Sequence, residues 1–368
     1  MPDQSLSTPP GRRPLLRPAL DAIPAYTPGR RATTALTAAL ASNESHLAPL
    51  PSVQDAVREA ASRVNRYPDA SAVRLRAAIG DALHVDPDTI SVGPGSVGVL
   101  QQLLAAFCDA GDEVVFAWRS FEAYPILVGL AGARAVTVPL TGDGAHDLDA
   151  MAAAVTERTR IVLLCVPNNP TGVGMPHTDL ERFLDRVPPT VLVVVDEAYA
   201  EFVDDPDAVD ALRLLDDHPN LCVLRTFSKA YGLAGLRIGY CAASAYTADG
   251  LRRAALPFGV GTAAQEAAIA SLAARGELRA RVAEVRAERE RVTTAARTQG
   301  RPVPVSQANF FWVPARGRRL AALLTAFGAA DVLVRPFADE GIRVTLADRA
   351  ANDRVLDVLA NAGVGVEQ

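Results

Sequence analysis

The stretch VLRTFSKAYGLAGLR, residues 223–237, holds a lysine in a place where an ammonium group is costly. Lys229 stands between an apolar run and a glycine-punctuated loop, and burying an unpaired charge is strongly unfavourable. The amine should therefore reach solvent, meet a counter-charge or take part in chemistry. An uncharged lysine amine can form an imine with a carbonyl group.

Two other polar residues close apolar runs in the same way. Asp196 begins DEAY (196–199) directly after VLVVV, and Asn169 lies in PNNPTG (167–172) after IVLLCV. Because α/β sheets bind ligands at the carboxyl ends of their strands, we expect both residues near Lys229. Taken alone, Asp196 is also consistent with a helix N-cap, and PNNPTG with a turn.

The run GPGSVG, residues 93–98, follows a predicted strand and opens the predicted helix GSVGVLQQLLAAF. Its backbone N–H groups and the positive end of that helix favour a phosphate. A dinucleotide fingerprint also fits these letters, but Trp118-Arg119 stand where its acidic residue is needed. Pro94 argues against a serine-hydrolase elbow, and an ordinary turn is the remaining alternative.

These four features together describe one cofactor. Pyridoxal phosphate needs a lysine for an imine, a carboxylate for its pyridinium nitrogen, hydrogen bonds for its phenolate oxygen and a cradle for its phosphate. A structural lysine would explain only one of the four.

The elements that position these residues alternate between short β-rich runs and helical stretches. Several runs are apolar throughout, as expected of strands covered on both faces, which predicts a layered α/β domain with a mostly parallel sheet. The predicted strands are 89–92, 113–118, 135–140, 161–166, 191–195, 221–226 and 237–242.

The 368 residues are enough for two domains. Residues 1–35 are rich in Pro, Arg, Ser and Thr and are predicted to be a flexible arm, and residues 36–260 a large domain. Residues 261–368 are predicted to form a smaller α+β domain, on which part of the N-terminal segment packs. A long helix over 277–298, strands NFFWV and GIRVTL, and a final helix over 352–362 are expected there.

Composition excludes several functions. The net charge of −5 gives no indication of a basic surface that would bind nucleic acid. The prolines and arginines of MPDQSLSTPPGRRPLLRP do not suit a signal peptide, and no apolar run is long enough to span a membrane. The four cysteines are widely spaced and are typical of core residues in a reducing compartment. We therefore expect a cytoplasmic protein without a metal.

These motifs together carry a family resemblance. The series SNE (42–44), RYPD (66–69), PNNPTG, DEAY, TFSKAYGLAGLR and SQANF (306–310) resembles the fold-type I pyridoxal-phosphate aminotransferases. Within them it is similar to the branch of histidinol-phosphate and aromatic amino acid aminotransferases, from about Ala38 to the C-terminus. The resemblance implies a homodimer with a mostly parallel seven-stranded sheet in the large domain.

The resemblance also implies residue roles in cofactor chemistry. Lys229 would bond covalently to pyridoxal 5′-phosphate and later carry a proton between the substrate Cα and the cofactor. Asp196 would keep the pyridine nitrogen protonated, while Asn169 and Tyr199 would hydrogen-bond the phenolate oxygen. Tyr124 of WRSFEAY matches the aromatic residue that stacks on the ring, although a core tyrosine is the plain alternative.

Phosphate and substrate groups are implied in the same way. Tyr67 of RYPD resembles the residue that reaches the neighbouring subunit's cofactor phosphate. The other phosphate-binding residues would be Arg237, Ser228, Thr226 and the backbone amides of Gly95, Ser96 and Val97. The substrate-binding residues would be Tyr26, Asn43, Arg335 and Arg343, with Arg343 on the α-carboxylate.

The loops favour one substrate class. GSVGVLQQL and WRSFEAYP resemble the phenylalanine-type aromatic aminotransferases more closely than the histidinol-phosphate branch. We therefore expect transamination between an aromatic amino acid and 2-oxoglutarate, with histidinol-phosphate transamination as the alternative. A related phosphoamino-acid decarboxylase would use the same cofactor-binding residues. A non-catalytic cofactor-binding regulator normally adds a helix-turn-helix domain, which a 35-residue arm cannot supply.

Overall fold

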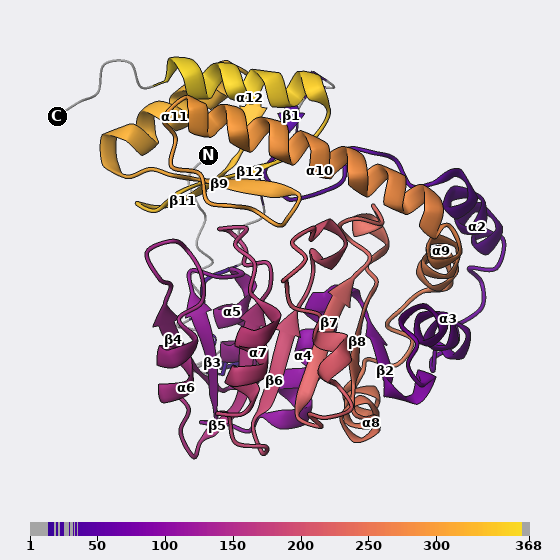
Figure 1. The fold of residues 1–368 in the computed structure, drawn as a ribbon. Coiled ribbons are helices and arrows are strands. Elements are labelled where there is room, and N and C mark those ends of the chain that lie inside the picture. The colour runs from indigo at the N-terminus through magenta and orange to yellow at the C-terminus, as the bar shows by residue number, and fades with distance from the viewer. Residues whose placement is uncertain are drawn as a thin grey trace.

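The computed structural model describes residues 36–362, together with residues 14–17, 20, 23–25, 29, 32 and 34. Its centre is a seven-stranded sheet of order β2-β8-β7-β6-β5-β3-β4, which crosses Figure 1 from right to left. The strands are β2 (Ile90–Gly93), β3 (Glu113–Trp118), β4 (Arg134–Pro139), β5 (Thr159–Cys165), β6 (Leu192–Asp196), β7 (Leu221–Thr226) and β8 (Gly239–Ala243).

The five strands β4, β3, β5, β6 and β7 pair in parallel with one another. Strand β8 pairs antiparallel with β7 on one side and with β2 on the other. Every residue of β6 is buried, because helices cover the sheet on both faces. The predicted α/β fold with a mostly parallel sheet is confirmed.

Two helical layers enclose this sheet. On one face, α4 (Gly95–Phe107), α5 (Ala123–Ala131) and α8 (Ala245–Ala254) share a core with Phe116, Leu163 and Val194. On the other face, α6 (Leu148–Ala153) and α7 (His177–Leu184) pack on Val115, Val162 and Val193. The alternation of neighbouring strand residues between the two cores follows from the period of two in a β-strand.

A third group of helices closes the β2 edge of the sheet. It consists of α2 (Pro51–Ala61), α3 (Val73–Leu83) and α9 (Thr262–Ala273), which lie together at the right of Figure 1. The sequence pattern extends the apolar face of the first of these helices to Val64, but α2 ends at Ala61 and Val64 is exposed. The short 3₁₀-helices are η1 (Pro87–Thr89), η2 (Ala200–Phe202), η3 (Ala211–Leu214) and η4 (Ala234–Leu236).

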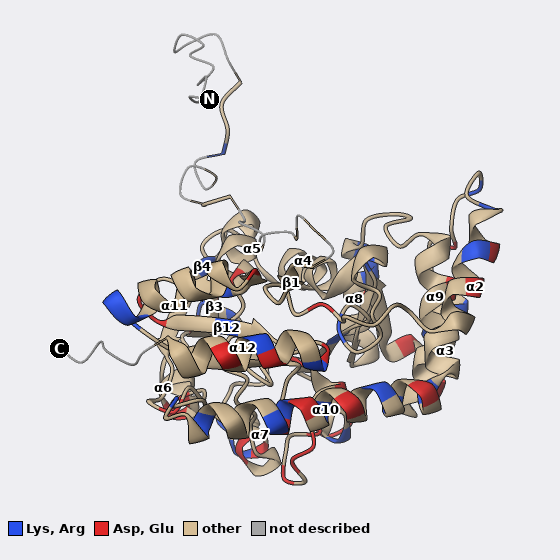
Figure 2. Ribbon diagram, turned by 90° about the horizontal axis from the view of Figure 1, so that it is seen from above, with Lys and Arg blue, Asp and Glu red and all other residues tan. Residues whose placement is uncertain are grey.

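A second, smaller sheet lies above the first. Strands β9 (Phe310–Pro314), β12 (Gly341–Thr345) and β11 (Arg335–Phe337) form it in the order β11-β12-β9, and all its pairs are antiparallel. Helices α10 (Arg275–Thr298), α11 (Gly317–Ala329) and α12 (Arg349–Asn361) accompany it. Positions of Lys or Arg and of Asp or Glu alternate along α10, as the blue and red segments of its ribbon show in Figure 2.

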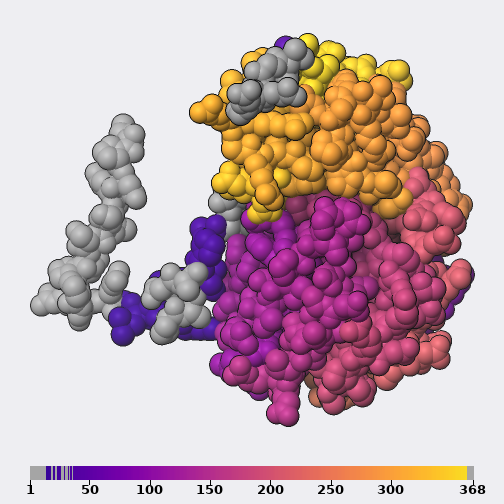
Figure 3. Space-filling model, turned by 60° about the vertical axis from the view of Figure 1, so that its left-hand side comes forward, coloured from indigo at the N-terminus to yellow at the C-terminus, as the bar shows by residue number. Residues whose placement is uncertain are grey.

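The start of the described chain also joins this upper unit. Strand β1 (Ala38–Ala39) pairs in parallel with β10 (Val332–Leu333), and both share a hydrophobic core with α10, α11 and α12. Figure 3 shows the C-terminal residues, in orange and yellow, as one block on the magenta block of the large sheet. The division near residue 260 stays a prediction, and residues 1–13 of the predicted arm lie outside the described residues.

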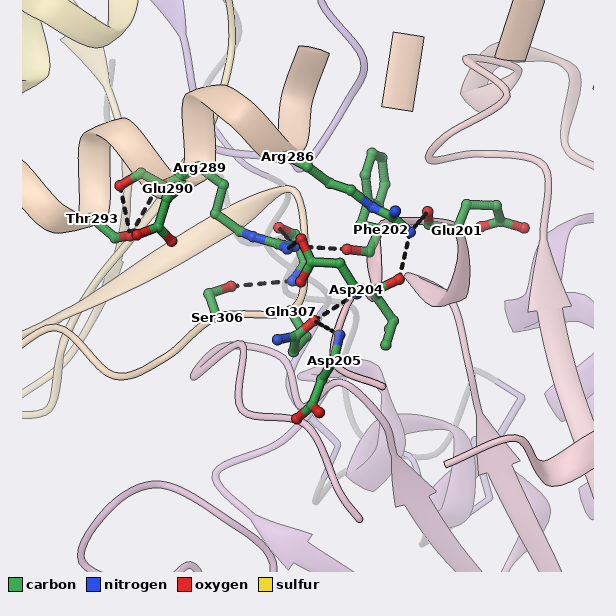
Figure 4. A network of polar contacts seen from close by, with 12 residues as sticks. Glu201, Phe202, Asp204, Asp205, Arg286, Arg289, Glu290, Thr293, Ser306 and Gln307 are labelled. Carbon is green, nitrogen blue, oxygen red and sulfur yellow. Dashed lines mark hydrogen bonds and ion pairs between the residues drawn. The ribbon is translucent and has the colours of Figure 1, made fainter. Parts of the chain in front are cut away.

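A polar cluster holds the two units together below α10 (Figure 4). The Arg289 guanidinium donates to the carbonyls of Phe202 (2.8 Å) and Ala308 (3.2 Å) and pairs with Asp204 (2.7 Å). The Gln307 Oε1 atom accepts the Asp204 backbone N–H at 2.9 Å. The loop after DEAY and the SQANF segment are thereby fixed to the same helix.

Candidate active site

A cavity of about 510 Å³ lies between the carboxyl ends of β5, β6 and β7 and the small sheet. Its volume suits a small organic ligand, and it stands at the edge of the sheet where parallel strands place ligands. Of the predicted site residues, it is lined by Asn43, Ser96, Val97, Asn169, Asp196, Tyr199, Thr226, Ser228, Lys229, Arg237, Arg335 and Arg343. The predicted grouping of residues far apart in the sequence is therefore present in the structure.

Lys229 extends into this cavity from the loop that follows β7. Its Nζ atom donates to the Ser42 carbonyl at 3.2 Å and lies 5.9 Å from the centre of the Tyr199 ring. Burial, and after it the positive charge of Arg343, lower the pKa of Lys229 from 10.5 to about 8. The amine thus loses its proton far more readily than an ordinary lysine.

Asp196 is the last residue of β6 and is buried on the cavity wall. Its Oδ2 atom accepts a hydrogen bond from the Tyr124 hydroxyl at 2.7 Å, while its buried Oδ1 atom meets no hydrogen-bond donor within the described chain. Burial raises the pKa of Asp196 to about 6, against the lowering effect of the Tyr124 hydrogen bond. A buried carboxylate oxygen without a donor fits a ligand that brings a charged N–H group.

Tyr124 differs from its expected position. Tyr124 is not among the described residues that line the cavity. Its ring is buried against Phe116 and Phe121 in edge-to-face contacts. What it contributes is the hydroxyl that holds Asp196.

Asn43, Asn169 and Tyr199 all line the cavity and each has a polar partner. The Asn43 side-chain amide donates to the Tyr199 hydroxyl at 3.0 Å, and its own oxygen accepts from Thr345 at 2.9 Å. The Asn169 oxygen accepts from the Arg343 guanidinium at 2.6 Å. Burial raises the pKa of the Tyr199 hydroxyl well above its ordinary value, so that it stays protonated and can donate as well as accept.

The N-terminus of α4 and Arg237 together form an anion cradle. Gly95 begins α4 with a φ of +77°, and a Cβ atom there would lie 2.3 Å from Arg237 Nη2. Arg237, itself in the left-handed region with a φ of +55°, donates to the Ser228 hydroxyl at 3.4 Å. Close approach of a guanidinium to the first amides of a helix, with a hydroxyl beside them, fits a phosphate group.

Two arginines and a glutamate also line the cavity. Arg335 and Arg343 are direct partners across β11 and β12, so both side chains leave the same face of the small sheet. Arg343 also donates to the Ala41 carbonyl at 2.6 Å. Glu122, at the start of α5, pairs with Arg335 at 2.8 Å.

Some predicted residues lie elsewhere, and some lining residues were missed. Tyr67 is 83% exposed and stacks on Phe258 outside the cavity, and Tyr26 lies outside the described residues. Sequence reasoning missed Glu122, which lines the cavity, and Thr345, which does not line it but donates to Asn43. For Glu122, a charged residue two positions before Tyr124 in WRSFEAY was a usable signal.

The described part of the chain has neither a metal-binding cluster nor a membrane-spanning helix. Residues 36–362 and the short described pieces before them contain no group of three or more His, Cys, Asp or Glu side chains able to hold a metal ion. No helix in that same part of the chain has the length and apolarity needed to cross a membrane.

Comparisons with known proteins agree with this geometry. The family model "Aminotransferase class I and II" matches residues 38–359. An aromatic amino acid aminotransferase of Streptomyces coelicolor is 52% identical over 94% of this chain and 96% of its own length. One of Rhodococcus jostii is 52% identical over 93% of this chain and 94% of its own length.

Among solved structures, a histidinol-phosphate aminotransferase from Sinorhizobium meliloti, in complex with pyridoxal-5′-phosphate, is similar with a TM-score of 0.86. It is 31% identical, over 94% of this chain and 97% of that one. The N-succinyldiaminopimelate aminotransferase of Mycobacterium tuberculosis is 25% identical, with a TM-score of 0.78, over 88% of this chain and 93% of that one.

Proposed function

The chain belongs to the class I and II aminotransferases, and we propose that it exchanges an amino group between an aromatic amino acid and 2-oxoglutarate. The observation that carries the substrate class is the 52% identity to a relative named aromatic amino acid aminotransferase, over 94% of this chain. The enzyme is a pyridoxal-phosphate-dependent transaminase, as its family and the site chemistry require.

The residues present fit pyridoxal 5′-phosphate. Asp196 has an oxygen that lacks a donor for a pyridinium N–H, and the Gly95 and Arg237 cradle has no space for a side chain beyond glycine. Arg237, Ser228, Thr226 and the first amides of α4 would hold the phosphate, and Asn169 and Tyr199 the phenolate oxygen. Lys229 would hold the group covalently through Nζ. When bound, the cofactor supplies an electron-accepting ring that stabilises negative charge at the substrate Cα.

Asp196 and Tyr124 control the charge at the ring nitrogen. An ionised Asp196 stabilises a proton on that nitrogen, and the Tyr124 hydroxyl keeps the carboxylate oriented. The pairing also restores a counter-charge to the buried carboxyl group, and this favours its ionised form.

Lys229 performs the proton transfers. Its Nζ atom, once free, takes the proton from the substrate Cα and returns a proton during the reverse half-reaction. A pKa of about 8 leaves roughly a tenth of the amine neutral at pH 7, so both the base form and the acid form are present in the working pH range.

Arg343 orients the substrate by its α-carboxylate. The Asn169 oxygen and the Ala41 carbonyl fix the guanidinium before substrate arrives, and this reduces the entropy lost on binding. Phe121, Ile126 and Leu127 line the same cavity and offer apolar surface to an aromatic side chain.

The active unit is a homodimer in this proposal. Tyr67, which is 83% exposed, would contact the cofactor phosphate of the neighbouring subunit. We place the enzyme in the cytoplasm, because three of its four free cysteines are buried and none is needed as a disulfide.

The test mixes purified holoenzyme separately with phenylalanine and with histidinol phosphate, and follows loss of the cofactor's visible absorbance and formation of the 2-oxo product. Phenylalanine should react and 2-oxoglutarate should regenerate the starting spectrum. Rapid reaction with histidinol phosphate and none with phenylalanine would overturn the aromatic assignment. A Lys229→Ala variant should show neither half-reaction.

A further inference from the structure

The Glu122–Arg335 ion pair lies inside the cavity that also holds Lys229. Arg335 Nε donates to Glu122 Oε2 and Arg335 Nη2 to Glu122 Oε1, each at 3.0 Å. The side chains are only 13% and 28% exposed. Removing one partner of such a two-point, largely buried pair is costly, because the other charge is then left in a partly desolvated site.

The position of the pair within the cavity is set by the small sheet. Arg335 stands directly opposite Arg343 across β11 and β12, so the two guanidinium groups occupy one wall. Arg343 is held on the side of Asn169, whereas Arg335 is held on the side of α5, beside Phe121 and Ile126. The wall therefore offers one cation for the α-carboxylate and a second for whatever the substrate carries at its far end.

We propose that Glu122 is a specificity-determining residue that acts as an internal counter-ion for Arg335 and thereby favours aromatic substrates over those with a distal carboxylate or phosphate. This inference rests on the proposed function. An aromatic ring brings no charge, so without Glu122 its binding would bury the Arg335 cation next to an apolar group. With Glu122 in place, the cation is already neutralised.

Substrates with a distal anion must compete with Glu122. The γ-carboxylate of glutamate or the phosphate of histidinol phosphate can bind the Arg335 fork only by displacing the Glu122 carboxylate from the same N–H donors. Glutamate and 2-oxoglutarate remain usable, but each carries this displacement cost. The same arginine can serve both substrate types because its partner is exchangeable.

Glu122→Gln tests this directly, because it keeps the side-chain shape and removes the charge. The ratio of kcat/KM for phenylalanine to kcat/KM for glutamate should fall by about tenfold or more. The value for glutamate should rise and the value for phenylalanine should fall. The kcat/KM for histidinol phosphate should rise, as it does for glutamate.

Glu340→Gln is the matched control. Glu340 pairs with Arg119, so this second ion pair also connects the turn before α5 to the β11–β12 hairpin. Its residues line a separate cleft and not the cavity of Lys229. A general loss of contact between the two units would therefore affect both variants alike and leave the substrate ratio unchanged.

A binding measurement separates this inference from turnover. Calorimetric titration of each holoenzyme with 3-phenylpropionate and with glutarate compares two carboxylates that differ in the distal group. In Glu122→Gln, the Kd of glutarate should fall by about tenfold relative to the Kd of 3-phenylpropionate. In Glu340→Gln, the ratio of the two Kd values should not change.

An unchanged ratio in Glu122→Gln, or equal changes in both variants, would overturn the role of Glu122. Failure of the wild-type enzyme to turn over phenylalanine, with the binding preference intact, would instead overturn the proposed function and leave the counter-ion role standing.

Discussion

At the residue scale, the site brings the pKa values of two opposite groups toward each other. Burial lowers the pKa of the Lys229 amine to about 8 and raises that of the Asp196 carboxyl to about 6. In both cases burial disfavours the charged form. Each group can therefore be stabilised by a ligand that supplies the missing bond or charge.

The Lys229 pKa predicts the pH dependence of cofactor loading. Only the neutral amine attacks the cofactor's carbonyl group, so the second-order rate of loading the cofactor-free enzyme should rise with pH and level off above about 8. The measurement is stopped-flow absorbance across roughly pH 6.5 to 9.5. A rate still climbing steeply at the top of that range would show an unperturbed lysine. Lys229→Arg should not form the absorbing species at any pH.

Asp196→Asn should separate activity from stability. The substitution removes the negative charge that stabilises a protonated ring, so kcat should fall by about 100-fold or more. Because the folded-state pKa of Asp196 is raised from 3.8 to about 6, the folded chain binds the proton more tightly than the unfolded chain. Stability of the cofactor-free wild type should therefore fall as pH rises from about 4 to 6, and this component should be missing in the variant. Equal pH profiles from chemical denaturation would contradict the raised pKa.

At the element scale, the large sheet and the main helices and strands of the small unit were predictable, and the shortest strands were not. Strands such as β6 are apolar throughout, which only a doubly covered strand tolerates. Strands β1 and β10 have two residues each and carry no periodic signal. The predicted start of β8 at Arg237 was wrong by two residues, because Arg237 adopts a left-handed backbone that no strand pattern reveals.

Gly95→Ala tests the cradle at the start of α4. The new methyl group would meet Arg237 Nη2, and the φ of +77° is unfavourable for alanine. Cofactor affinity should fall by about tenfold or more, measured by equilibrium titration of the cofactor-free enzyme. Gly250→Ala in α8 is the control, because no described heavy atom lies within 4 Å of its Cβ position. That control should bind normally and be slightly more stable.

Arg289→Met tests the cluster that fixes the two units to each other. It leaves the carbonyls of Phe202 and Ala308 without this donor and should lower the free energy of unfolding by about 2–4 kcal/mol. Asp204→Asn removes only the charge of a partner that is 43% exposed, and should cost under about 1 kcal/mol. Urea denaturation of both variants gives the comparison. Equal losses would mean that the ion pair, and not the two carbonyls, carries the stabilisation.

At the scale of the whole molecule, an exposed aromatic pair supports the proposed homodimer. Tyr67 stacks on Phe258 with ring centres 4.6 Å apart, and Leu256 beside them is 71% exposed. Apolar surface gathered in one place is typical of an interface.

Phe258→Asp should therefore convert the enzyme to a monomer with little activity, as sedimentation velocity and a phenylalanine assay would show. Burying a new charge in the dimer contact disfavours assembly, and Tyr67 would then lose access to the neighbouring subunit. Tyr246→Asp is the control, since Tyr246 is 84% exposed on α8. A Phe258→Asp dimer with full activity would place the interface elsewhere.

The candidate site was predictable where motifs carry the chemistry and missed where the fold brings single residues together. Lys229, Asp196 and Asn169 each close an apolar run, which is visible in the sequence. Glu122 gains its meaning only from Arg335, 213 positions away, and Thr345 only from Asn43. Apart from the charge of Glu122 in WRSFEAY, the local sequence gives no sign of these long-range partners.

The pairing of β1 with β10 has a consequence for synthesis on the ribosome. Ala39 must wait for Leu333 before its strand can form, and Ser42 and Asn43 follow it directly. At about 5–20 residues per second, that interval lasts roughly 15–60 s. The nascent polypeptide therefore contains Lys229 before Ser42 and Asn43 are fixed beside it. Binding of vitamin B6 in a complete site must consequently follow the last stage of translation.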